Sequence, residues 1–204
     1  MKILSIIKYL MVLFCFAYLG LAGCATSTQQ SKFFVLTPIF KNSSDSLPHS
    51  KEKIALGIGP LEFPTYLNRP NILDEVGANQ VRLSEFHRWA EPLEENFSRV
   101  LSENLSILLS TDQVSTFPWK SATPIDFQIT VSVSKFHGRL GTNSILECRW
   151  AIFRDYGKEV LVMKKSSFRE TIKGQGYDAL VLGLNKNLEN LSIEIANTVN
   201  TLKP

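Results

Sequence analysis

The sequence predicts an α+β fold, with two amphipathic helices packed on one face of a mostly antiparallel or mixed sheet. Short apolar segments bounded by Pro, Gly and polar residues are interrupted by two long segments of helical periodicity. The resulting order is strands, helix, strands, helix. Residues 127–133 alternate strictly between apolar and polar side chains, which indicates a strand with one buried face. The length after the N-terminal segment suits a single domain, residues 33–204.

The first part of the domain is predicted to be extended. Residues 33–36 form a short apolar segment and predict a first strand. A loop rich in Ser, Lys and Asp follows at residues 41–53. Residues 54–63 predict a second strand, which Pro64 ends. Residues 66–83 are expected to form an extended hairpin that turns at residues 76–79.

A long helix is predicted to begin near Trp89 and to end at residues 111–112. Pro92 suits its first turn, where the missing N–H has no helical partner in any case. Glu91, Glu94 and Glu95 place negative charge at the positive end of the helix dipole. The residues of its apolar stripe are Leu93, Phe97, Val100, Leu101, Leu105, Leu108 and Leu109.

The second half repeats this order. A brief strand at residues 114–117 precedes the alternating strand, in which Gln128, Thr130 and Ser132 are expected to face water. The alternation breaks at Phe136, which indicates a bulge or the end of the strand.

Residues 144–153 and 160–163 predict a hairpin turned at residues 155–158, and residues 167–172 predict one more strand. The stripe of the last helix comprises Leu180, Leu184, Leu188, Leu191 and Ile195.

Residues 1–23 have the layout of a secretory signal: Lys2 and Lys8, then a short apolar run, then small residues. The ending Leu-Ala-Gly-Cys resembles the bacterial lipobox, in which Cys24 becomes the acylated mature N-terminus. Several acyl chains anchor a protein firmly, at ~0.8 kcal/mol per buried CH₂. A transmembrane anchor with an incidental cysteine is the disfavoured alternative, because the apolar run is short. Residues 24–32 would form a lipidated tether.

Composition limits the class of partner. Without residues 1–23 the chain holds 20 basic and 19 acidic residues, a net charge of +1 that provides no footprint for nucleic acid. The only cysteine left after Cys15 is removed and Cys24 is acylated is Cys148, so no internal disulfide is expected. Cys148 shares strand parity with Trp150 and is expected to face the core, with a reactive thiol as the alternative.

No catalytic or metal-binding motif emerges. The three histidines, His49, His87 and His137, lack the spacing of a metal helix, and no Gly-x-Ser-x-Gly sequence is present. Residues 174–179 match the dinucleotide pattern with Ala in the last place, but a Rossmann unit needs a further strand after the following helix. The glycines are instead expected to turn the last strand into the helix. We therefore expect neither an enzyme nor a cofactor.

Three segments resemble the ABC-type transport auxiliary lipoprotein family, and more closely its PqiC branch. Residues 58–70 read Ile-Gly-Pro-Leu-Glu-Phe-Pro-Thr-Tyr-Leu-Asn-Arg-Pro, and residues 86–93 read Phe-His-Arg-Trp-Ala-Glu-Pro-Leu. Residues 191–196 read Leu-Ser-Ile-Glu-Ile-Ala, which is similar to the family's closing pattern. The resemblance extends from Phe33 to Val199.

The resemblance implies an outer-membrane lipoprotein that faces the periplasm and works with an MCE-domain, PqiB-like protein in lipid transport and membrane integrity. It implies no catalytic residues. Ala25 follows the lipobox cysteine in place of the Asp that commonly retains lipoproteins in the inner membrane, which agrees with outer-membrane placement. Self-association of the domain is left open.

The sequence leaves two functions to distinguish. In the first, the protein docks a periplasmic lipid conduit to the outer membrane, with Tyr66, Leu67, Arg69 and Trp89 as candidate partner-binding residues, because Tyr and Arg are enriched at interfaces. In the second, it is a lipid carrier or chaperone with an apolar cavity of its own.

Overall fold

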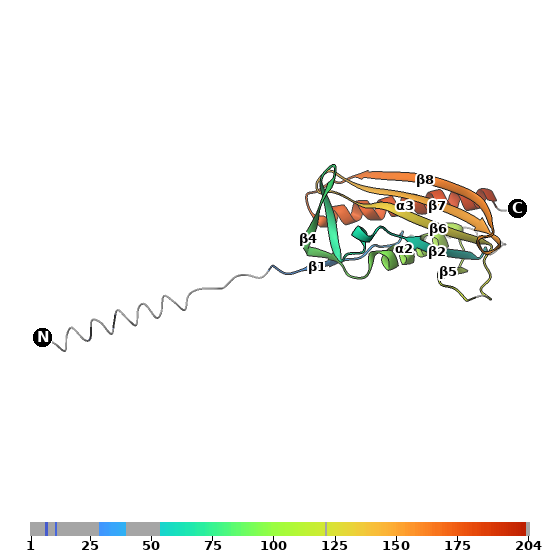
Figure 1. The fold of residues 1–204 in the computed structure, drawn as a ribbon, viewed down its shortest axis with the longest axis horizontal. Helices are drawn as coiled ribbons and strands as arrows, with labels where there is room; N and C mark the ends of the chain where they lie inside the picture. Colours follow the sequence, from blue (N-terminus) through green and yellow to red (C-terminus); the bar gives the residue numbers. More distant parts are fainter. Residues whose placement is uncertain (1–6, 8–10, 12–28, 40–53, 121, 203–204) are drawn as a thin grey trace, which may run out of the picture. The chain divides into compact units, whose positions relative to one another are not determined.

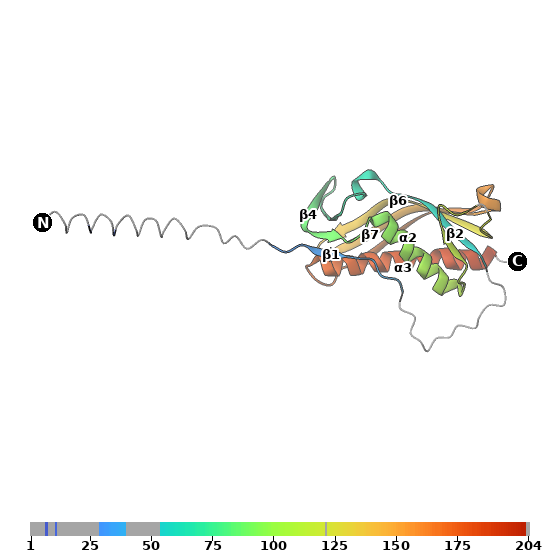
Figure 2. The same ribbon diagram turned by 90° about the horizontal axis from the view of Figure 1, so that it is seen from below.

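An eight-stranded sheet carries two long helices on one of its faces (Figures 1 and 2). The computed structural model describes residues 7, 11, 29–39, 54–120 and 122–202. Contacts divide the chain into residues 1–30 and 31–204, and every element named here lies in the second unit. Most of the predicted signal, Cys24 and the whole of the predicted loop at residues 41–53 lie outside the described residues.

The strands are β1 (Lys32–Phe34), β2 (Leu56–Glu62), β3 (Asn71–Gly77), β4 (Gln80–Trp89), β5 (Val114–Thr116), β6 (Phe127–Arg139), β7 (Asn143–Arg154) and β8 (Glu159–Thr171). The helices are α2 (Leu93–Leu109) and α3 (Tyr177–Leu202), with single 3₁₀ turns η1 (Thr65–Leu67) and η2 (Asp155–Gly157). The predicted α+β class and the two predicted helices are confirmed.

Strand β6 organises the sheet. One of its edges pairs antiparallel with β7, which in turn pairs antiparallel with β8. Its other edge pairs in parallel with β2 and then meets β3 where Asp74 lies opposite Gly138. The β3–β4 hairpin is antiparallel, and the short strands β1 and β5 add in parallel to β4 and β2. The sheet is therefore mixed.

The core lies between the sheet and the two helices. The predicted α3 stripe, from Leu180 to Ile195, is fully buried, and on α2 only Leu108 of the predicted stripe remains partly exposed. Cys148 faces this core, as its strand parity predicts, and is 1% exposed. Among the helices of the described residues, none is both long and apolar enough to cross a membrane.

The first helix begins later than predicted. Trp89 ends β4, and Pro92 is the extended N-cap residue instead of lying in the first turn. The backbone between them is used by the sheet, because Ala90 N–H donates to the carbonyl oxygen of Phe34 at 2.9 Å.

Three further predictions need correction or refinement. The two strands predicted at residues 160–163 and 167–172 are one strand, β8, which pairs with β7 along its length. Lys164 interrupts the apolar pattern there and lies over the ring of Trp150, 5.4 Å from its centroid. Gln128 is buried instead of facing water, since its Nε2 donates to the carbonyl oxygen of Gly59 at 3.0 Å. The irregularity near Phe136 is a bulge between Val133 and Lys135, because β6 continues to Arg139.

Candidate functional site

Two of the three segments that carry the family resemblance, residues 58–70 and 86–93, meet at one surface cleft of about 480 Å³. We call it the motif cleft; it is lined by Asn68, Arg69 and Pro70 on one side and by residues 89–95 on the other. The first segment leads into β3 and the second leaves β4. Antiparallel pairing places Asn71 opposite Arg88 and so brings the two segments together.

A direct backbone contact closes the base of the motif cleft. The N–H of Trp89 donates to the carbonyl oxygen of Pro70 at 2.6 Å. The Trp89 side chain is 5% exposed and belongs to the core, as does Leu67. Trp89 also lines the cleft, and neither residue presents its side chain freely at the surface.

Tyr66 and Arg69 differ in how far they reach solvent. Tyr66 is half-buried, and its hydroxyl donates to the carbonyl oxygen of Ser134 at 2.9 Å. Its ring lies edge-on to His137 with centroids 6.1 Å apart. Arg69 is exposed and lines the cleft. Of the four predicted partner-binding residues, Arg69 is therefore the one whose side chain is fully available.

The opposite wall of the motif cleft is acidic and ends at the start of α2. Glu91, Glu94 and Glu95 line it, and Glu91 is paired with Arg99 of the helix. Pro92 caps α2 without a side-chain hydrogen bond, so the first backbone N–H groups of the helix point toward this wall without a side-chain acceptor at the cap. Arg69 faces carboxylates across the cleft, and such a surface favours a partner that supplies both charges.

Burial shifts the pKa values of two neighbouring side chains, Tyr66 and His137. The pKa of Tyr66 is raised above 10.0, first by burial and then by the charges of Glu147 and Glu75, so its hydroxyl remains a hydrogen-bond donor. The pKa of His137 is lowered from 6.5, chiefly by burial. Its Nδ1 has no hydrogen-bond partner and lies 3.7 Å from the Glu75 carboxylate.

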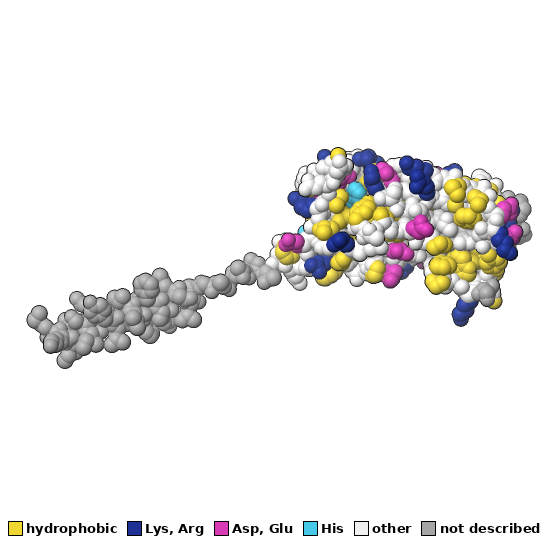
Figure 3. All heavy atoms as spheres, viewed as in Figure 1, with side chains coloured by type: hydrophobic (Ala, Val, Ile, Leu, Met, Phe, Trp, Pro, Cys, Tyr) yellow, Lys and Arg dark blue, Asp and Glu magenta, His cyan; other side chains and the backbone are white. Residues whose placement is uncertain are grey.

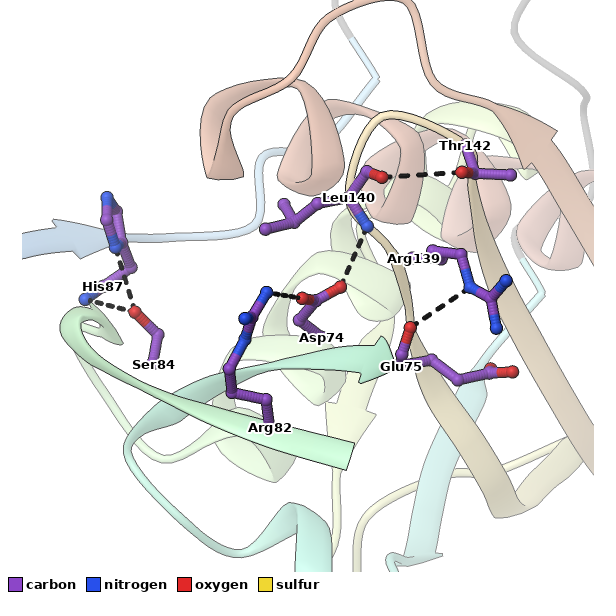
Figure 4. Close-up of polar contacts among 8 residues, drawn as sticks. All are labelled: Asp74, Glu75, Arg82, Ser84, His87, Arg139, Leu140 and Thr142. Carbon is purple, nitrogen blue, oxygen red and sulfur yellow. Dashed lines mark hydrogen bonds and ion pairs between the residues drawn. The ribbon is translucent and has the colours of Figure 1, made fainter. Parts of the chain in front are cut away.

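A second polar cluster joins the β3–β4 hairpin to the β6–β7 turn (Figure 4). Asp74, 3% exposed, pairs with Arg82 and accepts from Leu140 N–H at 3.0 Å. Arg139 Nε donates to the carbonyl oxygen of Glu75 at 3.2 Å. The contacts of Asp74 to Arg82 and Leu140 therefore hold the β3–β4 hairpin against the β6–β7 turn. The signal that could have located it is a carboxylate within the apolar run Ile72–Val76.

The described residues hold neither a metal-ligating cluster nor a reactive cysteine. Within residues 29–39, 54–120 and 122–202, no group of three His, Cys, Asp or Glu side chains is placed to hold a metal ion. Burial raises the pKa of the Cys148 thiol to about 12, which keeps it protonated and unreactive at neutral pH. The arrangement suits binding through a surface cleft.

The comparisons with known proteins agree with the motifs. Residues 35–196 match the family described as the ABC-type transport auxiliary lipoprotein component, a range that includes all three motif segments. The chain is 24% identical over 166 residues to the intermembrane transport lipoprotein PqiC of Escherichia coli, covering 81% of this chain and 84% of that protein. The PqiC of Shigella flexneri matches equally.

Two solved structures share the fold. A crystal structure of an uncharacterized protein superposes with a TM-score of 0.69 at 18% identity, covering 84% of this chain and 99% of that one. A protein from Xanthomonas campestris superposes with a TM-score of 0.64 at 10% identity, covering 81% and 92%. The match over residues 35–196 shows that the chain belongs to the ABC-type transport auxiliary lipoprotein family and is similar to PqiC.

Proposed function

We propose that this protein is a lipid-anchored subunit of an intermembrane lipid-transport system. Acylated Cys24 would hold it at the outer membrane, facing the periplasm. There it would dock an MCE-domain, PqiB-like conduit and support membrane integrity. Membership of the auxiliary lipoprotein family and similarity to PqiC, an intermembrane transport lipoprotein, support the transport role. The lipobox-like sequence that ends at Cys24 supports the anchor.

One observation carries the docking role: the two motif segments converge on a single exposed cleft. They are separated in sequence by the β3–β4 hairpin, yet both line the motif cleft. Trp89, a buried member of the motifs, belongs to the core and lines the cleft, and the exposed Arg69 lines it as well. Rigid support beneath an exposed Arg is the arrangement of an interface hot spot.

The test is co-purification of the full-length lipoprotein with the MCE-domain protein of the same organism. Arg69→Glu should reduce recovery of the MCE-domain protein about tenfold or more. Arg169→Glu, an equal charge change at an exposed position of β8, should leave recovery unchanged. If the wild-type proteins fail to co-purify, or both variants behave like wild type, the docking role is wrong.

The carrier alternative makes a different prediction. Native mass spectrometry of the purified lipoprotein would reveal a stoichiometric non-covalent lipid in addition to the acyl chains. The interior positions of α3, including Leu184, Leu188 and Leu191, are already fully buried by the protein itself. We therefore expect no such lipid.

A further inference from the structure

A second groove lies beside the motif cleft, between α2 and the β2 edge of the sheet. It has a volume of about 700 Å³, and we call it the α2–β2 groove. Glu94 and Glu95 line both hollows, so the groove continues from the motif cleft around the first turn of α2. Its apolar lining includes Ile58, Leu61 and Phe117, the last 54% exposed. Figure 3 shows apolar side chains gathered over the region of β2 and β5 labelled in Figure 1.

Three small side chains lie on the helix wall of this groove. Ser98, Ser102 and Ser106 recur once per turn on the lining flank of α2. Ser102 Oγ donates to the carbonyl oxygen of Ser98, and Ser106 Oγ donates to that of Thr111, each at 2.7 Å. The small size of the three serines, two of which have their hydroxyls bonded within the chain, leaves space for another chain to approach the helix.

The sheet wall of the groove includes a stretch of β2 that β5 does not cover. Strand β5 pairs with β2 only from Leu56 to Ile58. Beyond that point Leu61 pairs with β6 and lines the groove, and no further strand of the described residues pairs with β2 there. An edge of this kind favours an extended segment, with side chains alternating between the groove floor and the solvent.

The charge of the groove selects the occupant. Four exposed carboxylates line it, from Glu94, Glu95, Glu103 and Asp112, against a single cation, Arg99. Arg99 is already paired with Glu91. Apolar floor and acidic rim together complement a segment in which apolar and basic residues alternate.

We propose that the α2–β2 groove binds an extended segment of a partner protein in which basic and apolar residues alternate. The inference rests on the proposed docking role and names the chemistry of the partner. The segment would lie against the β2 edge, place apolar side chains near Phe117 and direct its Lys or Arg residues to the carboxylates. The motif cleft and the groove would then act as one continuous docking surface.

The test uses the full-length lipoprotein in non-ionic detergent and two labelled synthetic peptides, one alternating Leu with Lys and one alternating Leu with Glu. Fluorescence anisotropy should show tighter binding of the Leu–Lys peptide, with affinity falling as salt rises. Glu103→Lys combined with Asp112→Lys should weaken that binding about tenfold, since each exposed pair contributes modestly. Glu85→Lys combined with Glu159→Lys makes the same charge change at exposed positions outside the groove and should preserve binding.

A steric variant distinguishes binding of the peptide in the groove from a general attraction to negative charge. Ser102→Trp fills the groove without altering charge and should abolish binding, while Leu182→Trp, at an exposed position of α3, should not. Circular dichroism of each variant checks that it remains folded.

Equal binding of both peptides, or binding unchanged by Ser102→Trp, would overturn the proposal. Displacement of the peptide by phospholipid would overturn it as well, by making the groove a lipid site. These measurements do not use the MCE-domain protein, so they fail or succeed independently of the co-purification above.

Discussion

The backbone N–H of Trp89 donates to the carbonyl oxygen of Pro70 at 2.6 Å and so joins the two motif segments across the β3–β4 hairpin. The contact ties a core tryptophan to the segment that carries the exposed Arg69. Because Trp89 belongs to the core and also lines the motif cleft, the geometry of the cleft depends on the packing of the core. A change at Trp89 should therefore affect both the stability of the fold and the shape of the cleft.

Trp89→Ala should destabilise the protein by about 3–5 kcal/mol, the usual cost of removing a buried large aromatic side chain. Urea denaturation followed by circular dichroism measures this free energy of unfolding. Trp119→Ala is the matched control, since Trp119 is partly exposed and should cost distinctly less. Equal losses for the two variants would show that Trp89 does not support the fold as described.

The helices could be predicted from sequence, but the motif cleft could not. The apolar residues of α3 recur at helical spacing and lie on one buried face, so the local sequence pattern is sufficient to locate the helix. The cleft depends on the β3–β4 register and on a backbone bond between Pro70 and Trp89, and neither leaves a local pattern. The burial of Leu67 and Trp89 likewise depends on tertiary structure and leaves no local sequence pattern. The sequence indicates that these residues belong together without revealing which of them face solvent.

Parallel pairings were also beyond local prediction. Strand β2 lies beside β6 although Leu56 and its partner Phe127 are 71 positions apart in the sequence, a pairing set by the whole topology. Strand β8 was divided in the prediction because Lys164 and Lys165 interrupt its apolar pattern. Lys164 is accommodated by stacking on Trp150, a contact between strands that sequence periodicity does not report.

Tyr66→Phe should lower the free energy of unfolding by about 1 kcal/mol, because the carbonyl oxygen of Ser134 loses its side-chain donor in a partly buried site. Tyr156→Phe provides the control. Its hydroxyl also donates to a backbone carbonyl, that of Thr123 at 3.1 Å, but Tyr156 is 53% exposed and water replaces the bond. Thermal unfolding of the two variants should therefore differ, and identical melting temperatures would contradict the role assigned to Tyr66.

Stability should fall as the pH is lowered below about 6.5, in part because of His137. Burial lowers its folded-state pKa from 6.5, so between the two pKa values the unfolded chain binds the additional proton. The contribution is complete above pH 6.5 and declines until the folded-state pKa is reached. Lys135 opposes protonation of His137, whereas Glu75 and Glu147 favour it.

Two measurements check this titration. NMR of the His137 ring should give a midpoint below 6.5 in the folded protein. His137→Gln should flatten the dependence of the unfolding free energy on pH in the acidic range. A midpoint above 6.5, as an ion pair with Glu75 would produce, would contradict the prediction.

Asn104→Ala should destabilise the protein by about 2 kcal/mol and release the segment that follows β1. Asn104 Oδ1 accepts from Ile39 N–H at 2.8 Å, and its Nδ2 donates to Ser192 Oγ at 3.1 Å, so one side chain joins this segment to both helices. One partly buried and one buried hydrogen bond, at roughly 1 kcal/mol each, give the expected loss. Hydrogen exchange at Ile39 should accelerate. Asn185→Ala, which removes exposed contacts to Thr37, should cost less, and the reverse order would be inconsistent with Asn104 as the main attachment.

Cys24→Ser, with a cleavable signal supplied so that the domain still reaches the periplasm, should abolish function without unfolding the domain. In the proposed function acylation would supply the membrane attachment, and a fully extended eight-residue tether after Cys24 would reach at most ~26–29 Å, which would restrict where the domain meets its partner. Palmitate labelling and membrane fractionation should both become negative, while circular dichroism of the variant remains that of the folded protein. Sensitivity of the envelope to detergent should then match that of a deletion strain. Full activity from the free domain would show that anchoring is dispensable, and the function would have to be sought in the domain alone.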